Sequence, residues 1–275
     1  MSQTPDLAAI AREIKTAQDK TRQLEPFTSR LAGFDLASAY AVARQVHATR
    51  LREGAVPVGR KIGFTNPAMW DVYGVREPIW AYIYDRTVVR AAALPVRCAI
   101  GAFAEPRIEP EIIFHFRSAP MANATLAEIL ACIDWVAHGF EIVQSHFPGW
   151  KFQAADTVAD QSLHGTLLVG TPQPVDRLGP DPVEALAQFS IALYCGGALR
   201  DTGKGANVLG NPLAAIAHLT TVLAAQPQSH PLQAGEVVTT GTLTAAHPVR
   251  PGETWRTAIE GIDLPGCAVA FTAHA

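Results

Sequence analysis

The chain has 275 residues, of which 48% are hydrophobic and 17% are charged, and its formal net charge is −3. This length allows one large domain or two modest ones and is ample for a buried core. The charge balance, without any block of Lys or Arg, excludes nucleic acid as an expected partner. The low charged fraction favours a homo-oligomer whose subunits cover some apolar surface.

Cysteines and termini indicate the compartment. The four cysteines are widely scattered with no CxxC pair, which predicts reduced core residues in a cytoplasmic protein. The N-terminus has no basic segment followed by an apolar run, and no apolar stretch approaches the roughly 18 residues that cross a membrane. We therefore expect neither a secretory signal nor a membrane partner.

Periodic patterns divide the chain into a helical part and a β-rich part. Residues 6–53 carry apolar side chains at three- and four-residue intervals, and the proline in Glu25–Thr28 separates two helices, the second beginning at Asp35. Beyond residue 58, Gly and Pro clusters separate short β-like runs. These runs are Gly59–Phe64, Tyr82–Val89, Ile108–Phe116, Phe140–Gln144, Gly165–Gly170, Phe189–Cys195, Glu236–Thr242 and Cys267–Ala273.

Two further helices interrupt the strands. One runs from about Thr125 to Ala137, with Gly139 where a C-terminal cap would fall. The other covers Leu213–Ala225, with Asn211 as N-cap and a proline in the first turn.

The order of the elements predicts the fold class. Strands with few intervening helices favour an α+β fold with a curved mixed or antiparallel sheet. The expected organisation is an N-terminal helical arm at residues 1–57 and a catalytic domain at residues 58–275, in one structural unit.

Two glutamates at i and i+2 are the most informative feature of the chain. Glu109 and Glu111 share one face of an extended segment, and their apolar neighbours place that face near a core. Neighbouring carboxylates in a poorly solvated place repel, so a proton or a cation must offset their charge. A third carboxylate, Glu141, would complete an all-oxygen site that suits Mg²⁺ or Mn²⁺ better than zinc. The alternative is a solvent-exposed edge strand, which Pro110 favours because proline cannot donate to a sheet ladder.

Lys61 is a candidate for proton transfer. It lies in the Gly-bounded segment Gly59–Thr65, where burial or a nearby metal would lower its pKa and let it move a proton on or off a carbon next to a carbonyl. The alternative is an exposed lysine at the rim of a strand. Two polar segments leave similar choices, because Ala155–Gly165 either lines a site or caps elements, and Thr239–Thr244 either binds a carboxylate or satisfies a turn.

Six motifs in this order resemble those of the fumarylacetoacetate hydrolase superfamily, and most of all its branch of 2-oxopent-4-enoate hydratases and 4-oxalocrotonate decarboxylases. The resemblance covers nearly the whole chain and implies a mixed β-roll that holds Mg²⁺ or Mn²⁺ on three carboxylates. The motifs are Gly59–Thr65, Arg107–Ile112, Phe140–Lys151, Asp156–Asp160, Gly203–Pro212 and Thr240–Thr244.

The resemblance also implies roles for single residues. The three metal-binding carboxylates map onto Glu109, Glu111 and Glu141, and the substrate would be a 2-oxo or 2-hydroxydienoic acid that chelates the ion. Lys61 is implied as the proton shuttle or the anchor of the substrate carboxylate. The other implied site residues are Asp160 and Gln161, which would position water, His164 as a possible acid or base, and Arg60, Lys151, Trp80, Thr242 and Thr244 at the substrate.

Some positions depart from the motifs and shape the expected pocket. The usual Glu-Pro-Asp-Tyr-Gly reads Glu77–Ala81, so an apolar and aromatic wall replaces a polar one. Leu163 and His164 replace two serines, and Thr242 replaces a third. His164 is either an acid or base gained in exchange or only part of the pocket wall.

The expected function is that of a metal-dependent lyase, a hydratase first and a decarboxylase as the alternative. Hydrolysis of a carbon–carbon bond in an acylpyruvate would need an acid/base pair in the arm, where Glu13 and His47 show no His-x-x-Glu spacing. The chain could also be a non-catalytic partner in a complex with a homologous hydratase or decarboxylase subunit. Retention of the three glutamates and of Lys61 argues against that role.

Overall fold

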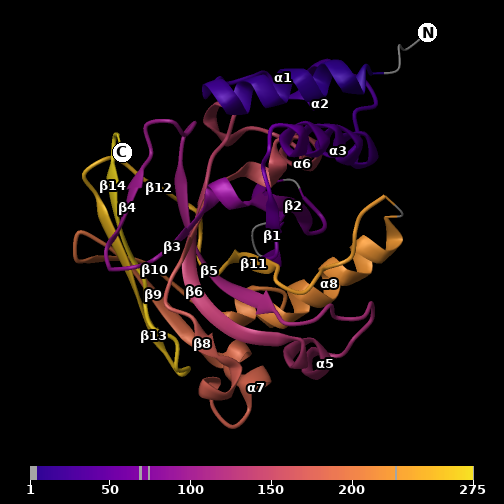
Figure 1. The fold of residues 1–275 in the computed structure, drawn as a ribbon. Helices are drawn as coiled ribbons and strands as arrows, with labels where there is room; N and C mark the ends of the chain where they lie inside the picture. Colours follow the sequence, from indigo (N-terminus) through magenta and orange to yellow (C-terminus); the bar gives the residue numbers. More distant parts are fainter. Residues whose placement is uncertain (1–4, 68–69, 74, 227, 275) are drawn as a thin grey trace.

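The computed structural model describes residues 5–67, 70–73, 75–226 and 228–274. Three helices form an arm that lies over one end of a strand-rich body (Figure 1). The side chain of Asp35 accepts a hydrogen bond from the backbone N–H of Ser38, which confirms the predicted start of the long second helix. The arm helices are α1 (Leu7–Lys20), α2 (Phe27–Arg30) and α3 (Leu36–Arg52).

A nine-stranded sheet forms the larger part of the body. Its strand order is β2-β1-β11-β5-β6-β7-β3, with β12 paired to β5 and β8 paired to β6. The long strands β5 and β6 pair antiparallel and β1 pairs with β11 in parallel, so the sheet is mixed, as predicted. The strands are β1 (Pro57–Gly63), β2 (Ile79–Tyr84), β3 (Val88–Arg90), β5 (Arg107–Phe116), β6 (Ile133–Val143), β7 (His164–Val169), β8 (Gln173–Pro174), β11 (Val237–Thr242) and β12 (His247–Pro248).

A smaller sheet of five strands completes the body. Its strand order is β10-β9-β13-β14-β4. Ile108 and Phe140 of the large sheet are buried in one apolar cluster with Leu193 and Val269 of the small sheet, so the two sheets share a core. The strands are β4 (Val96–Ala99), β9 (Ser190–Cys195), β10 (Ala198–Lys204), β13 (Thr254–Glu260) and β14 (Ala268–Thr272), of which β4, β10 and β13 were not predicted.

The arm is packed into the body. Ile14, Phe27 and Val42 from the arm are buried together with Phe147 and Val158 from the body. Because these side chains form a single apolar cluster, the position of the arm is fixed relative to the sheet. The remaining short helices are α4 (Trp70–Tyr73), α6 (Ala154–Ala159) and α7 (Pro182–Gln188), and the 3₁₀ turns are η2 (Asp85–Thr87), η3 (Pro148–Trp150), η4 (Gln161–Leu163), η5 (Val175–Leu178) and η6 (Gly205–Asn207).

The helix predicted from Thr125 to Ala137 is wrong in its second half. Thr125 does cap a helix, but that helix, α5 (Leu126–Ala131), ends after six residues and β6 follows. The apolar residues beyond it pair with β5 instead of continuing the helix. Gly139 is therefore not a helix cap. It lies inside β6, where a Cβ atom would approach the carbonyl oxygen of Leu168 to 2.2 Å.

The helix α8 (Pro212–Ala225) begins as predicted, because the side chain of Asn211 accepts a hydrogen bond from the backbone N–H of Leu213. Although the sequence predicted no such run, Gly205–Ala225 is long and apolar enough to cross a membrane by length and composition alone. Half of that segment is buried, and Ile216 and Leu219 belong to the largest core cluster. The structure thus identifies α8 as a helix of the protein core.

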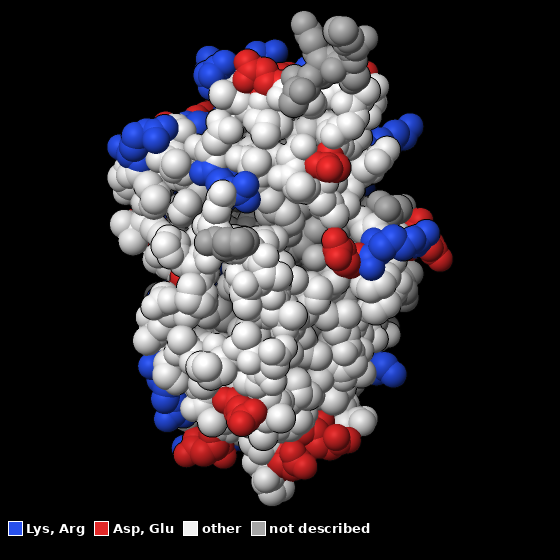
Figure 2. All heavy atoms as spheres, turned by 90° about the vertical axis from the view of Figure 1, so that its right-hand side faces the viewer, with Lys and Arg blue, Asp and Glu red and all other residues white. Residues whose placement is uncertain are grey.

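The lower half of one face of the molecule carries few charges away from its edges. In Figure 2, which faces the side where Figure 1 places α8 and α5, charged side chains of the lower half gather at the bottom and the edges. A broad area without charged groups lies between them.

Candidate metal centre and pocket

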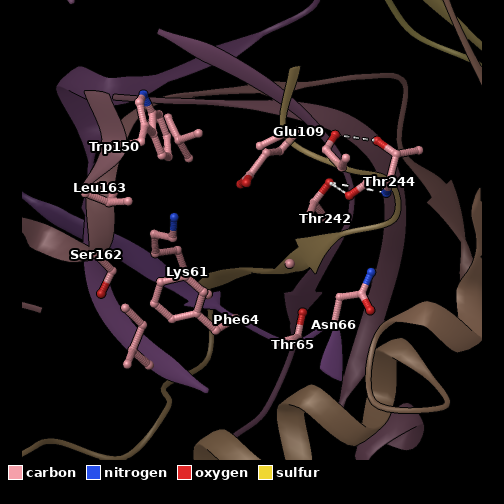
Figure 3. Close-up of a pocket in the computed structure, with 16 residues that line it drawn as sticks. Lys61, Phe64, Thr65, Asn66, Glu109, Trp150, Ser162, Leu163, Thr242 and Thr244 are labelled. Atoms are coloured by element: carbon pink, nitrogen blue, oxygen red, sulfur yellow. Dashed lines mark hydrogen bonds between the residues drawn. The ribbon is translucent and has the colours of Figure 1, made fainter. Parts of the chain in front are cut away.

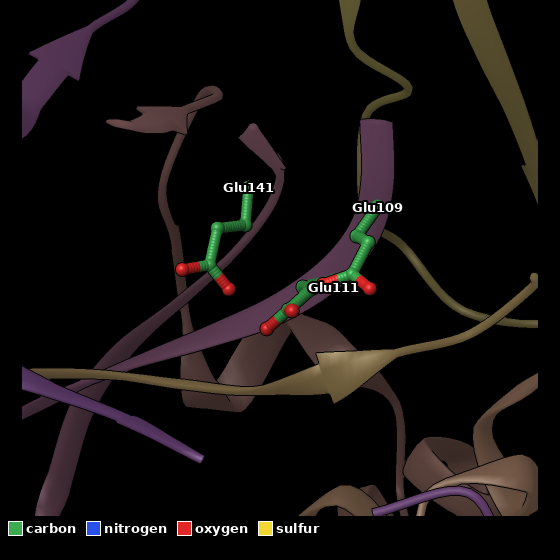
Figure 4. Close-up of side chains that lie close together, drawn as sticks. All are labelled: Glu109, Glu111 and Glu141. Carbon is green, nitrogen blue, oxygen red and sulfur yellow. The ribbon is translucent and has the colours of Figure 1, made fainter. Parts of the chain in front are cut away.

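Glu109, Glu111 and Glu141 come together because β5 and β6 pair in one particular register. Glu109 lies directly opposite Glu141, and Glu111 lies opposite Gly139. One oxygen from each carboxylate lies within 4.8 Å of the other two (Figure 4). The alternative of a solvent-exposed edge strand is wrong, because β5 is flanked by β11 and β6.

An irregularity in β11 lies beside Pro110 and holds Glu111. The pairing of β11 with β5 shifts between Thr239 and Thr242, next to the position where Pro110 lacks an N–H. Within this irregularity, the backbone N–H of Gly241 donates to Oε2 of Glu111 at 2.8 Å. The hydroxyl of Thr239 donates to the same oxygen. The carboxylate of Glu111 is therefore fixed in orientation.

The second oxygen of the Glu111 carboxylate is the feature that favours a bound cation. Oε1 is buried and has no hydrogen-bond partner among the described residues. Burial, together with the charges of Glu141 and Glu109, raises the pKa of Glu111 well above its usual range. Burial and the charge of Glu141 also raise the pKa of Glu109 to about 7, although Lys61 opposes this. A divalent cation would give Oε1 a partner and offset this repulsion, so the residues fit such an ion.

Glu141 differs from the other two because it has cationic and hydrogen-bonding partners. Nζ of Lys61 lies 2.9 Å from Oε2 of Glu141, and Nδ1 of His164 lies 2.6 Å from Oε1. Burial alone would raise the pKa of Glu141, but Lys61 and His164 outweigh it and lower the pKa to about 2. Glu141 is thus ionised throughout the physiological range.

Lys61 is buried as predicted, which excludes the exposed rim lysine. The expected lowering of its pKa is wrong, however. Burial does lower the pKa of Lys61, but the charges of Glu141, Glu109 and Glu111 outweigh burial and raise it above its ordinary value. Lys61 is therefore a charged ammonium group among the three carboxylates.

A pocket opens beside the carboxylates. Lys61 and Glu109 point into it, and Thr242 and Thr244 lie on its opposite wall (Figure 3). The hydroxyl of Thr242 donates to the carbonyl of Thr244 at 3.0 Å, and that of Thr244 donates to the carbonyl of Ala245 at 2.9 Å. The larger apolar residues of the lining are Phe64, Ile79, Val143, Trp150 and Leu163, and Ala245 and Ala246 complete its apolar part.

Arg60, Trp80 and Lys151 do not belong to the described lining of this pocket. Arg60 follows the alternation of β1 to the opposite face from Lys61, where its Nη1 lies 2.5 Å from Oε1 of Glu236. Trp80 stacks against Tyr40 outside this pocket. Lys151 is exposed.

Asp160 and Gln161 contact other groups of the protein and lie outside the described lining of the pocket. Asp160 lies 2.8 Å from Nδ1 of the buried His146, and Gln161 donates to the carbonyl of Tyr82 at 3.2 Å. His164 contacts Glu141 through Nδ1, and its Nε2 lies 2.8 Å from the hydroxyl of Thr87. The structure thus places His164 against Glu141, one of the three clustered carboxylates, where it fixes the orientation of that group.

Of the residues that line the pocket, the sequence marked Leu163 as pocket-shaping and Ser162 only as part of a polar segment, and it did not single out Phe64 or Trp150. Phe64, Trp150, Ser162 and Leu163 all have positive φ, a conformation that their residue types do not favour. Trp150 lies within a quoted motif, which was the one available signal for it. Thr65 also lines the pocket, and its hydroxyl oxygen is buried without a hydrogen-bond partner among the described residues.

The sequence matches the family described as Fumarylacetoacetate (FAA) hydrolase C-terminal over residues 71–267. It is 31% identical to 2-hydroxyhexa-2,4-dienoate hydratase of Comamonas testosteroni, over 99% of this chain and all of that protein. It is 31% identical to 2-keto-4-pentenoate hydratase 1 of Dechloromonas aromatica, over 92% of this chain and 93% of the relative.

A solved structure has the same fold. The 4-oxalocrotonate decarboxylase from Pseudomonas putida G7, complexed with magnesium and adipate, superposes with a TM-score of 0.87 at 25% identity. The match covers 98% of this chain and 100% of that one, and it confirms the predicted β-roll with its helical arm. Together with the family match over residues 71–267, these similarities show that the chain belongs to the fumarylacetoacetate hydrolase family.

Proposed function

We propose that this protein is a divalent-metal-dependent hydro-lyase that hydrates a short 2-hydroxydienoate or 2-oxo-alkenoate. The observation that carries the proposal is the convergence of three glutamates and one buried lysine on a pocket with an apolar wall. The full-length similarity to two hydratases supports the same reaction.

Glu109, Glu111 and Glu141 would hold the ion, and a set of three carboxylates suits Mg²⁺ or Mn²⁺. When bound, the ion stabilises negative charge that develops on the 2-oxygen of the substrate. Similar folds have been crystallised with magnesium, calcium and Mn²⁺, which supports a divalent ion without selecting one.

The chain's own residues would manage binding and protons. Lys61 lies between the carboxylates and the pocket, where it would hold the substrate carboxylate or carry the proton that converts the dienol to the ketone. Water would then add to the conjugated alkene and give a 4-hydroxy-2-oxo acid. His164 would keep Glu141 in place, and Trp150 would limit access of bulk water at the wall.

The lining favours a substrate with one carboxylate. Lys61 is the one cationic side chain in the described lining, and the apolar residues provide surface for an uncharged tail. A second carboxylate at the far end of the substrate would lose its hydration there without gaining a cationic partner. Arg107 is a nearby cation but lies outside the described lining. Its guanidinium carbon lies 4.0 Å from the centroid of the Trp150 ring, on which the group stacks.

Decarboxylation is the second candidate, since the decarboxylase from Pseudomonas putida G7 superposes over nearly the entire chain. The 2-oxo group of the substrate would accept the electrons that departing carbon dioxide leaves behind, and an ion held by Glu109, Glu111 and Glu141 would stabilise the resulting negative charge. The substrate of that reaction carries two carboxylates, and the similarity to two hydratases over nearly the whole chain favours hydration.

Calorimetric titration with Mg²⁺ and with Mn²⁺, with and without oxalate, tests the site. Oxalate reproduces the carboxylate and the 2-oxygen of a 2-oxo acid, so we expect it to bind only when metal is present. Glu109→Ala and Glu141→Ala should abolish metal binding, and an unchanged metal affinity in both would refute the assignment. Incubation with 2-hydroxypenta-2,4-dienoate and with 4-oxalocrotonate, followed by detection of the hydrated product and of carbon dioxide, then distinguishes the two reactions.

A cytoplasmic location and assembly into a homo-oligomer are further parts of this proposal. The broad uncharged area on one face of the molecule supports assembly, because such areas are commonly covered by a partner (Figure 2).

A further inference from the structure

The turn η4 forms part of the pocket wall in an unfavourable backbone conformation. Gln161, Ser162 and Leu163 have φ angles of 51°, 50° and 64°. Such angles cost about 1 kcal/mol or more for each residue that is not glycine, so surrounding contacts must hold them. Ser162 and Leu163 line the pocket on the same side as Lys61 (Figure 3).

Backbone contacts close this turn at both ends. The N–H of Leu163 donates to the carbonyl of Asp160 at 2.8 Å, and the carbonyl of Leu163 accepts from the N–H of Gln144 at 2.9 Å. The backbone of Asp160 therefore anchors one end of the turn that carries Leu163.

A buried cluster fixes Asp160. Its two carboxylate oxygens lie 2.9 Å and 2.8 Å from Nδ1 of His146, and Nε2 of Gln18 in the arm donates to Oδ1 at 3.1 Å. The side chains of His146 and Asp160 are each 1% exposed. Because the carboxylate accepts at Nδ1, that nitrogen carries the proton. Nε2 of His146 is buried without a hydrogen-bond partner among the described residues, so the aspartate contact accounts for the position of this ring.

We propose that His146 and Asp160 are positioning residues, which hold η4 so that Leu163 contacts the tail of the 2-oxo acid. Gln18 extends this support to α1, so the helical arm contributes to substrate recognition. The inference rests on the proposed function, because it assigns the apolar wall to the substrate tail. His146 and Asp160 act through Leu163 and lie outside the described lining of the pocket.

The test compares two ligands that share the metal-binding end. Oxalate has no tail, whereas 2-oxopentanoate has the same chelating atoms and an apolar tail. Both are titrated calorimetrically at saturating Mg²⁺ into the wild type, His146→Leu, His146→Asn and Gln18→Leu. In His146→Asn, the amide nitrogen replaces Nδ1 as donor to Asp160. Thr21→Ala is the matched control, because it removes another hydrogen bond from the arm to the body, donated to the carbonyl of Ala102.

His146→Leu should weaken binding of 2-oxopentanoate about tenfold, as expected for loss of a hydrogen bond to a charged group. Its affinities for oxalate and Mg²⁺ should stay within about twofold of wild type. His146→Asn should restore most of the loss, Gln18→Leu should show a smaller loss confined to 2-oxopentanoate, and Thr21→Ala should bind both ligands normally.

Equal losses for oxalate and 2-oxopentanoate would overturn the proposal, because they indicate general damage to the site. Unchanged binding of 2-oxopentanoate in His146→Leu would do the same. If His146→Leu does not fold, Gln18→Leu decides by the same comparison. Failure of the wild type to bind either ligand with Mg²⁺ would instead refute the proposed function, and the role of the wall with it.

Discussion

Magnesium should bind more weakly at pH 6 than at pH 8, because protons compete for the same carboxylates. Burial and the charge of Glu141 raise the pKa of Glu109 to about 7, while the pKa of Glu111 is raised well above its usual range. Glu141 stays ionised, since its pKa is lowered to about 2. The ion must therefore displace protons from Glu109 and Glu111 at pH 6.

The size of the effect follows from the pKa of Glu109. A group with a pKa near 7 is about one-tenth ionised at pH 6 and about nine-tenths ionised at pH 8, which changes metal affinity about tenfold, or about 1.4 kcal/mol. The protonation of Glu111 acts in the same direction, so tenfold is a lower bound.

Protonation of the same carboxylates also changes the free energy of unfolding of the metal-free protein. A raised carboxyl pKa means that the folded state binds more protons than the unfolded state between the ordinary value of 4.5 and about 7. Stability without metal should therefore fall as the pH rises through this window, by up to about 3 kcal/mol for Glu109 alone. Added Mg²⁺ should raise the unfolding temperature more at pH 8 than at pH 6.

Isothermal titration calorimetry with Mg²⁺ at both pH values, together with thermal unfolding, measures both effects. Glu109→Gln serves as the control in the unfolding measurement without metal, because it removes the titrating carboxyl group and should reduce the fall in stability with rising pH. Equal affinity at the two pH values, or tighter binding at pH 6, would refute the reasoning.

Three further predictions concern the surroundings of the carboxylates. Gly139→Ala should lower the free energy of unfolding by about 2–4 kcal/mol, since its Cβ would approach the carbonyl oxygen of a neighbouring strand to 2.2 Å. Gly33→Ala, at a site with no neighbouring atom within 4 Å, should cost about 1 kcal/mol in the same denaturant titration. His164→Leu should weaken Mg²⁺ binding by about tenfold or more, because it removes the contact that orients Glu141, and calorimetry showing wild-type affinity would contradict this. Lys61→Met should abolish turnover while Mg²⁺ affinity holds or increases, because the competing ammonium group is gone. A parallel loss of metal affinity would show that Lys61 supports the metal site.

The sequence predicted the carboxylates better than their surroundings. Glu109 and Glu111 could be placed on one face because strand alternation is local, and Glu141 followed from its apolar neighbours and from family resemblance. The helix expected from Thr125 to Ala137 was wrong because residues after Ala131 satisfy a helical spacing and a strand equally well. Pairing with β5 decides between them, and pairing is a tertiary interaction.

The backbone conformation of the pocket wall could not be predicted for a related reason. Gln161, Ser162 and Leu163 have no preference for positive φ, so no turn signal marks them. Their conformation depends on contacts from His146 and Gln18, which are distant in sequence. Similarly, the raised pKa of Lys61 required knowledge of its distance from Glu141, whereas burial alone suggested the opposite direction.

The register of β5 and β6 brings the carboxylates together in the folded chain without help from a metal ion. Ile108 pairs with Ile142 on one side of the pair formed by Glu109 and Glu141, and Pro110 pairs with Phe140 on the other side, so apolar packing aligns the carboxylates before any ion arrives. Without an ion the three carboxylates repel one another, and the apolar packing of the sheet outweighs this repulsion. The protein is therefore expected to reach its native state in a chelator and to take up or release its ion as a ligand, unlike small domains that fold only around a metal.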